Sequence, residues 1–218
     1  GLIGLMFVNG HGGAHNTVPW GGADRRLCTN PMAAGFPTGA EPIVLDISTS
    51  AVAEGKVRTY RMRGQTVPDH WRVDSEGRAT NDANVLYTKP QGALLPLGGS
   101  VGYKGFGLGM MVDLLAGGLS GAGTSGPNAD RGGNAFTLIA LDPAAFDGAE
   151  EFRADAASLV AWVKSSRLAP GFSEITVPGE PERRERARRL RDGIPLAEET
   201  WQQLTEAASK GGIASSDR

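Results

Sequence analysis

The chain has 218 residues, a formal net charge of −2 and a hydrophobic share of 40%. This length is enough to bury the core of one domain or of two small ones, which excludes a peptide hormone or a disulfide miniprotein. The charge gives no general basic footprint for nucleic acid, and no apolar run approaches the roughly 20 residues that span a bilayer. We therefore expect a globular protein that binds neither nucleic acid nor membrane.

The cysteine count and the start of the chain bear on where the protein works. Cys28 is the single cysteine, so the chain cannot form an internal disulfide, and a reducing, cytoplasmic location is expected. The sequence begins at Gly1 inside an apolar run, without an initiator Met or the charged and small-residue marks of a signal peptide. We expect that a front part of the protein precedes it.

The first half of the chain predicts two buried strands and two helices. Residues 2–8 are typical of a buried strand, and the Gly- and Pro-rich residues 10–40 of a long loop. A second buried strand covers residues 42–47, and Ser48-Thr49-Ser50 is expected to cap the helix that follows. That helix is placed near residues 57–63, ahead of a polar, turn-rich segment, and a clear amphipathic helix opens at Gly105.

The second half predicts one more strand and three helices. Residues 134–141 form a strand and residues 149–166 an amphipathic helix, both expected in the core. An Arg-dense helix follows residues 177–182, and a last helix covers residues 196–209. The Arg run is expected to be a solvated face with pairs such as Glu185 with Arg189. Contact with RNA is the alternative reading of that run.

Several familiar motifs are absent or misplaced. Residues 121–126 match G-x-G-x-x-G as letters, but they follow a predicted helix instead of a strand, so they do not predict a Rossmann site. His11 and His15 are separated by a segment containing Gly12-Gly13, which argues against a helix that presents both to a metal ion. Cys28 has no nearby base to activate it. We expect no metal site.

Several short blocks of the sequence would allow the main chain to approach a polar ligand closely. Lys104 stands in Gly-Tyr-Lys-Gly at the start of a helix, where a positive charge and free N–H groups fit a phosphate or a carboxylate. Asp46 ends a strand, where a carboxylate can accept a hydrogen bond from a ribose hydroxyl. Each block alone is equally typical of an ordinary turn.

Taken in order, the blocks resemble the type-2 malate/L-lactate dehydrogenase family over nearly the whole chain. The matching blocks are Asn9 with Pro19-Trp20-Gly21-Gly22, Thr29-Asn30-Pro31, Asp46 to Ser50, Glu54-Gly55-Lys56-Val57, Leu94 to Gly99, Lys104-Gly105, Leu119-Ser120-Gly121 and Pro178-Gly179-Glu180. The stretch around Glu54 and the Gly-His at the front are most similar to the branch called hydroxycarboxylate dehydrogenase B.

The resemblance implies a fold and an activity. The expected fold class is α/β, a non-Rossmann NAD(P)-binding fold with a largely antiparallel sheet, flanking helices and C-terminal helices. The expected activity is hydride transfer between NAD or NADP and a 2-oxo acid/2-hydroxy acid pair, such as malate, lactate or an aryl analogue, in a homodimer. We place the NAD(P)-binding domain at residues 1–145 and a C-terminal helical segment at residues 146–218.

The resemblance also assigns residues to the cofactor. It implies cofactor contacts by Thr29, Asp46, Ile47, Ser48, Tyr103, Lys104, Asn134, Gly179 and Glu180. The family's proton-donating His has no counterpart in this chain and is expected before Gly1, so no catalytic residue is assigned here. Tyr103 stands where many relatives have His, and Lys56 stands where the imino acid reductases have Asp. The competing hypothesis is a non-catalytic nucleotide-binding or assembly module on the same scaffold.

Overall fold

The computed structural model describes residues 1–11, 15–127 and 132–212. The chain divides into two compact units, Gly1–Gly179 and Glu180–Arg218. Gly12-Gly13 of the predicted loop lie outside the described residues. The functional division into residues 1–145 and 146–218 remains a prediction.

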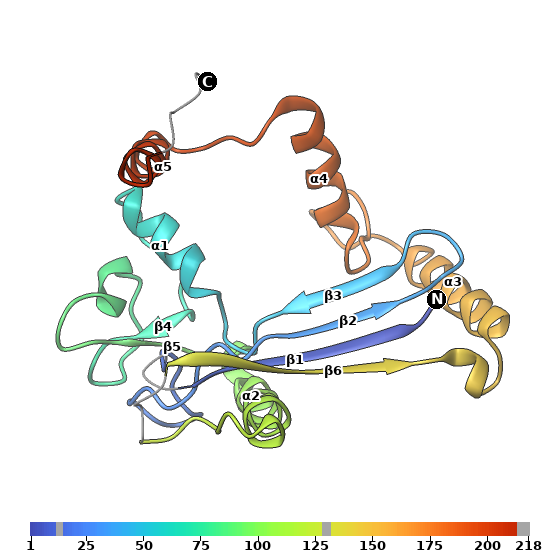
Figure 1. The fold of residues 1–218 in the computed structure, drawn as a ribbon, viewed down its shortest axis with the longest axis horizontal. Coiled ribbons are helices and arrows are strands. Elements are labelled where there is room, and N and C mark those ends of the chain that lie inside the picture. Colours follow the sequence, from blue (N-terminus) through green and yellow to red (C-terminus); the bar gives the residue numbers. More distant parts are fainter. Residues whose placement is uncertain (12–14, 128–131, 213–218) are drawn as a thin grey trace. The chain divides into compact units, whose positions relative to one another are not determined.

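A four-stranded antiparallel sheet is the main feature of the first unit (Figure 1). The strands stand in the order β3-β2-β1-β6, and they are β1 (Ile3–His11), β2 (Met32–Phe36), β3 (Ile43–Ile47) and β6 (Gly133–Leu141). Three of them are the apolar runs that predicted strands, which confirms the strands. Their expected burial is wrong for β3, which has no buried residue, and for β6, in which only Ala135 is buried. The mixed α/β class with an antiparallel sheet is confirmed as well.

Strand β2 corrects the predicted loop over residues 10–40. Its sequence, Met-Ala-Ala-Gly-Phe, has little of the β-branched and aromatic content that favours strands. It is extended because it has a strand on each side: Leu5 of β1 and Leu45 of β3 both stand opposite Ala34. Pairing in the folded sheet therefore decides the conformation of this segment.

Helix α2 (Tyr103–Asp113) packs on one face of the sheet and continues into the π-helical segment η3 (Leu114–Gly118). Val112 and Ala116 pack with Phe7 of β1 in a buried cluster. The Thr137 hydroxyl of β6 donates to the Leu115 carbonyl at 2.7 Å. The helix predicted to open at Gly105 is confirmed and starts slightly earlier.

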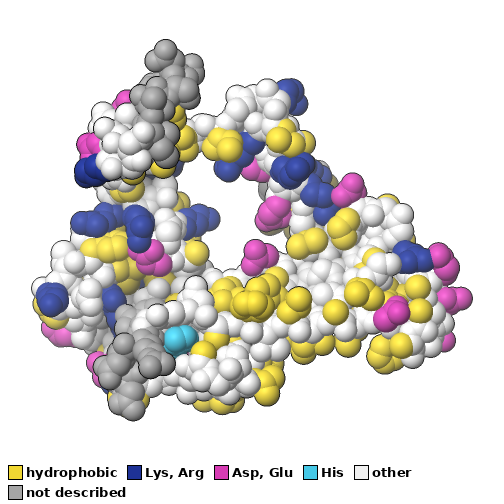
Figure 2. Space-filling model, in the orientation of Figure 1, with side chains coloured by type: hydrophobic (Ala, Val, Ile, Leu, Met, Phe, Trp, Pro, Cys, Tyr) yellow, Lys and Arg dark blue, Asp and Glu magenta, His cyan; other side chains and the backbone are white. Residues whose placement is uncertain are grey.

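The opposite face of the sheet carries apolar side chains and one carboxylate. Residues directly opposite in antiparallel strands share a face, so Asp46, Ala33, Met6 and Leu138 form one row across the four strands. Phe136 and Leu138 on the edge strand β6 are 60% and 64% exposed. Figure 2 shows apolar side chains along these strands.

Residues 52–95 form a second core, which we call the small lobe. Its elements are α1 (Glu54–Met62), β4 (Arg72–Val73), η1 (Ala83–Leu86) and β5 (Ala93–Leu94), and η2 (Gly99–Val101) follows it. The side chains of Val52, Val57, Val67, Ala83, Leu86 and Leu94 are buried together. The helix predicted near residues 57–63 is confirmed, whereas the expected polar, turn-rich segment is corrected because it contains β4, η1 and β5.

The predicted helix cap at residues 48–50 is wrong. Helix α1 begins at Glu54 after Ala53, and no side chain caps it. The Ser50 hydroxyl instead donates to the Val52 carbonyl at 2.8 Å, and the Ser48 hydroxyl donates to the Ser50 carbonyl at 3.1 Å. The serines therefore stabilise the turn between β3 and α1.

Helix α3 (Ala149–Lys164) follows the short η4 (Pro143–Ala145) and closes the set of helices in the first unit. The helix is confirmed, but its expected place in the core is wrong, because none of its side chains is buried. Leu159 and Trp162 are 57% and 77% exposed. The amphipathic period predicted the helix correctly and did not determine what its apolar side contacts.

The second unit contains α4 (Glu180–Asp192) and α5 (Glu198–Lys210), which confirms both predicted helices. Glu185 accepts hydrogen bonds from Arg188 at 2.7 Å and from Arg189 at 2.6 Å, so the predicted Glu185–Arg189 pair is formed. These two guanidinium groups lower the pKa of Glu185 to about 2. None of the described helices has the length and apolar character needed to cross a membrane.

Candidate functional site

The antiparallel register gathers several predicted site residues at one end of the sheet. β1 and β3 finish at this end, whereas β2 and β6 start there. Ile47 stands opposite Met32, next to the segment that carries Thr29. Asn134 stands opposite Gly10 at the end of β1. Residues from three distant parts of the sequence thus lie towards the same end of the sheet.

Main-chain contacts tie the Thr29 segment to the turn after β3. The Thr49 amide and hydroxyl both donate to the Thr29 carbonyl at 3.0 Å, and the hydroxyl also contacts the Asn30 carbonyl at 3.0 Å. The Thr49 carbonyl in turn accepts from the Leu97 amide at 2.9 Å. These bonds hold the blocks around Thr29, Ser48 and Leu97 against one another.

Helix α2 joins this group through a glycine. A Cβ on Gly105 would lie 2.2 Å from the Leu97 carbonyl oxygen, so only glycine lets the helix approach the Leu97 main chain so closely. Lys104 and Tyr103, the two preceding residues, are exposed there. The Tyr103 ring meets Trp20 edge-on at a centroid distance of 6.3 Å. The Lys104 ammonium group and the first turn of α2 therefore lie near the turn that follows β3, and together they could bind an anion.

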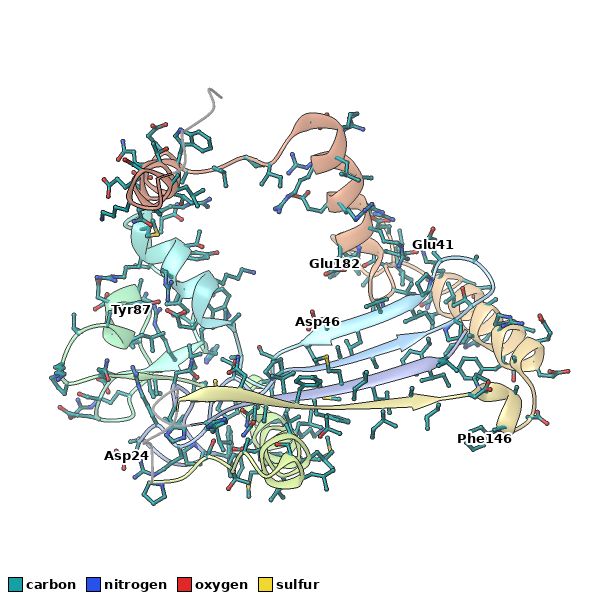
Figure 3. All side chains as sticks on the ribbon, in the orientation of Figure 1. Asp24, Glu41, Asp46, Tyr87, Phe146 and Glu182 are labelled. Atoms are coloured by element: carbon teal, nitrogen blue, oxygen red, sulfur yellow. The ribbon has the colours of Figure 1, made fainter. Side chains whose placement is uncertain are left out.

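Asp46 projects from the open face of the sheet. Its side chain is exposed, and within the described ranges no hydrogen bond or ion pair involves its carboxylate. Figure 3 shows the carboxylate pointing outward from β3. A ligand hydroxyl can reach such an acceptor without displacing a protein partner.

The predicted pair Gly179 and Glu180 falls on the boundary between the two units. The Val44 amide of β3 donates to the Pro178 carbonyl at 3.1 Å, so the end of the first unit lies beside the strand that carries Asp46. Gly179 is buried and has a φ of 94°, a conformation that favours glycine. Glu180 is the first residue of the second unit.

A buried polar cluster at the end of β1 was not predicted. Asn9 is fully buried, and its amide donates to the Asp113 carboxylate of α2 at 2.7 Å. The same carboxylate oxygen accepts from the Ser125 amide at 3.0 Å. An acidic residue inside the apolar run Met110 to Leu115 was the signal that could have indicated it, because a buried acid needs partners.

Asn30 plays a similar part for the middle of α2. It is fully buried in a left-handed conformation with a φ of 38°, and its side-chain amide donates to the Gly109 carbonyl at 2.9 Å. Asn is among the few residues that adopt this conformation readily. Asn30 therefore fixes α2 under the sheet end, while the neighbouring Thr29 is half-buried.

The arrangement of His, Cys, Asp and Glu side chains bears on whether the site could hold a metal ion. Among residues 1–11, 15–127 and 132–212, no group of three His, Cys, Asp or Glu side chains is placed to hold a metal ion. The geometry of the sheet end is one of exposed polar groups, a cation and a helix start.

Comparison with known proteins gives one family. The profile of malate/L-lactate dehydrogenase matches residues 1–205. The chain is 35% identical over 221 residues to malate dehydrogenase of Pyrococcus horikoshii, covering 98% of this chain and 60% of that protein. It is 34% identical over 221 residues to hydroxycarboxylate dehydrogenase B of Escherichia coli, covering 98% and 59%.

A solved structure agrees with these relatives. The malate dehydrogenase of Pyrococcus horikoshii superposes with a TM-score of 0.83 at 31% identity, covering 99% of this chain and 59% of that one. The chain thus spans about three fifths of the length of the relatives it matches. Sequence and structure together show that the chain belongs to the malate/L-lactate dehydrogenase family.

Proposed function

We propose that this chain binds NAD or NADP and forms the cofactor-binding part of an oxidoreductase. The reaction is hydride transfer between the nicotinamide and a 2-oxo acid/2-hydroxy acid pair, such as malate, lactate or an aryl analogue. The fold that carries it is the non-Rossmann fold of the family, in which residues 1–145 bind the cofactor. Relatives with the names malate dehydrogenase and hydroxycarboxylate dehydrogenase B support this reaction class.

One observation carries the proposal. The residues that the resemblance assigns to the cofactor come from distant segments, yet the segments of Thr29, Ser48 and Asn134 all lie towards one end of the sheet. An unpaired carboxylate on β3 and a lysine at the start of α2 stand at the same end. A dinucleotide needs both kinds of group, because its ribose offers hydroxyl donors and its pyrophosphate is an anion.

The residues present fit such a cofactor. Asp46 would accept from a ribose hydroxyl, and Lys104 with the first turn of α2 would bind the pyrophosphate. Ile47, Ser48 and Thr29 would line the approach, and Gly179, the last residue of the first unit, would lie beside them. The resemblance adds Glu180. When bound, the cofactor supplies the hydride at C4 of its nicotinamide.

Thermal melting of the chain with NADH and, separately, with NADPH tests cofactor binding. A ligand that binds only the folded state at about 100 times its Kd adds about 2.7 kcal/mol to the free energy of unfolding. We expect a saturable rise in Tm with one of the two nucleotides, which also identifies the cofactor. No rise with either contradicts the proposal.

A pair of variants localises the binding. Asp46→Asn should weaken nucleotide protection because it removes the charged acceptor for the ribose. Asp155→Asn changes an exposed carboxylate of α3 and serves as the matched control. Equal protection in both variants would separate Asp46 from the cofactor site.

We also propose that these 218 residues turn over 2-oxo acids hardly at all by themselves. The family resemblance assigns proton donation to a His outside this sequence, and reduction of the carbonyl needs that proton. Steady oxidation of NADH with phenylpyruvate or oxaloacetate by the chain alone would contradict this.

The alternative function is a non-catalytic binding or assembly module that keeps the scaffold. The exposed carboxylate of Asp46 and the exposed Lys104 favour the dehydrogenase, because both are groups that a dinucleotide would bind. A module that binds no nucleotide does not require them. A module that binds no nucleotide would show no protection by NADH or NADPH.

For the whole protein we propose a cytoplasmic homodimer. Support comes from the exposed apolar side chains of Phe136 and Leu138 on the edge strand β6, which a second copy can cover, and from the free thiol of Cys28. Light scattering after size exclusion measures the mass. Leu138→Lys should shift it towards the monomer, whereas Leu159→Lys on α3 is the control.

A further inference from the structure

None of the residues assigned to the cofactor is among the described residues that line a cavity in the first unit. Its volume is about 770 Å³, and it is lined by the segment after β1, by α2 and by the segment before residue 128. Five of its lining residues are apolar: Pro19, Leu27, Phe106, Met110 and Pro127. The others are His15, Arg25, Arg26, Ser125 and Gly126. Pockets of this size and character hold small organic ligands.

The two arginines of the cavity differ in how their charges are neutralised. Arg26 makes an ion pair with Asp24 at 2.7 Å. Arg25 donates instead to the main-chain carbonyls of Gly92 at 2.7 Å and Leu86 at 3.0 Å. Burial lowers the pKa of Arg25. In the described part of the chain no acid pairs with Arg25, so the cavity wall keeps one uncompensated positive charge.

Two further lining residues carry polar atoms without partners. The Nε2 atom of His15 and the hydroxyl of Ser125 are buried, and neither has a hydrogen-bond partner within residues 1–11, 15–127 and 132–212. The main chain at Ser125 is fixed, because its amide donates to Asp113. Buried polar atoms are normally satisfied, and side-chain rotation can bring both groups to a ligand that offers an acceptor.

We propose that this cavity receives the acid substrate, and that the substrate is a monocarboxylate with a bulky apolar side chain. The carboxylate would lie near Arg25 and accept hydrogen bonds from His15 and Ser125. The apolar part would pack against Leu27, Phe106 and Met110. This inference rests on the proposed function and chooses among its substrate classes.

The charge balance of the cavity argues against a dicarboxylate. A single uncompensated cation matches one carboxylate. The second carboxylate of malate would lie among the apolar side chains without a partner, and burying an unpaired charge is unfavourable. An aryl or long alkyl side chain gains from the same surroundings.

Calorimetric titration of the full chain with phenyllactate and with malate tests the inference. The oxidised form of the nucleotide identified by thermal melting is present at saturation, because it is the redox partner of a 2-hydroxy acid. We expect phenyllactate to bind at least about tenfold more tightly than malate, the scale on which apolar pockets discriminate. Equal affinity, tighter binding of malate, or no binding of either acid overturns the inference.

Matched variants on α2 assign the binding to this cavity. Met110→Glu places a negative charge in the wall and should weaken phenyllactate binding about tenfold or more. Met111→Glu is its control, because the adjacent side chain is also partly exposed but does not line the cavity. Ser125→Ala removes one predicted donor with little risk to folding and should weaken binding severalfold.

The outcomes separate the inference from the proposed function. Protection by NADH together with unchanged phenyllactate binding in Met110→Glu and Ser125→Ala overturns the cavity as the substrate site and leaves the dehydrogenase proposal in place. Cavity-dependent phenyllactate binding without protection by either nucleotide supports the acid site and contradicts the cofactor proposal.

Discussion

The end of β1 and the small lobe bury polar groups in opposite ways. At the end of β1, the Asp113 carboxylate accepts from the Asn9 side chain and from the Ser125 amide. In the small lobe, Arg72 is fully buried, and none of its three guanidinium nitrogens has a hydrogen-bond partner among the residues that the structure describes. A buried polar group stabilises a fold only when its bonds to water are replaced. The Oδ1 atom of Asn9 also lacks a partner among the described residues, so the contrast concerns the charged groups: the Asp113 carboxylate is hydrogen-bonded, whereas the Arg72 guanidinium is not.

The surroundings of Arg72 follow from its register. Arg72 of β4 stands opposite Leu94 of β5, and cross-strand partners share a face. Leu94 belongs to the apolar core of the small lobe, so the guanidinium enters that core. Burial lowers the pKa of Arg72, and the negative charge of Asp82 opposes this only in part.

The largest effect is expected at the paired cluster. Asp113→Ala removes the acceptor of two buried donors, and we expect the free energy of unfolding to fall by about 3 kcal/mol, since unsatisfied buried groups cost about 1–3 kcal/mol each. Urea unfolding measures this. Asp113→Asn keeps one acceptor and should lose less. A loss in Asp113→Ala no larger than that of Asp155→Asn would remove the contrast.

The next effect has the opposite sign. Arg72→Met keeps an unbranched apolar stem, although a shorter one, and removes the unpaired charge, so we expect the free energy of unfolding to rise by about 1–4 kcal/mol. Arg78→Met is the control, because Arg78 is exposed and should change stability by no more than about 0.5 kcal/mol. A clear destabilisation by Arg72→Met would mean that the guanidinium has a stabilising partner.

A third variant tests a half-buried group that lies between these extremes. The Tyr87 hydroxyl donates to Glu54 at 2.5 Å, and burial together with this bond raises the pKa of Tyr87 to about 12. Tyr87→Phe should lower the free energy of unfolding by about 1 kcal/mol. Tyr103→Phe, at an exposed position, should leave it unchanged.

The raised pKa of Tyr87 also sets a pH dependence. The folded value lies above the usual value near 10, so the stabilisation is complete below about pH 10 and is lost as the pH rises through about 12. Tyrosinate absorbance during alkaline titration measures the pKa. Titration of all tyrosines near pH 10 would contradict the bond to Glu54.

These contacts show which parts of the fold the sequence could predict. Continuous apolar runs predicted β1, β3 and β6, but the same runs wrongly predicted that β3 and β6 are buried. β2 was missed because Ala33, Ala34 and Gly35 have no strand preference of their own. The serines after β3 were misread because a hydroxyl satisfies a turn as readily as a helix start. Local composition therefore predicts elements better than the contacts between them.

The members of the site remain a prediction from the resemblance, and the structure describes only where they lie. Thr29, Ser48 and Asn134 were assigned by resemblance, and the register then brings their segments to one sheet end. The Asn9–Asp113 pair joins residues more than 100 positions apart in sequence, and no local period connects them. Only the acid in an apolar helix indicated that such a partner must exist.

The smallest effect belongs to the exposed pairs of α4, where water surrounds both charges. Arg188 and Arg189 lower the pKa of Glu185 from 4.5 to about 2. Stabilisation from a lowered carboxyl pKa is present above the unfolded value and is lost as the pH falls through the folded one.

The helicity of α4, measured by circular dichroism, should therefore decline by a small step between about pH 4.5 and 2. Glu185→Gln should remove that step and Glu206→Gln on α5 should keep it, and added salt should reduce it because exposed charges are screened. A step of equal size in both variants would mean that the arginine pairs contribute nothing to the helix.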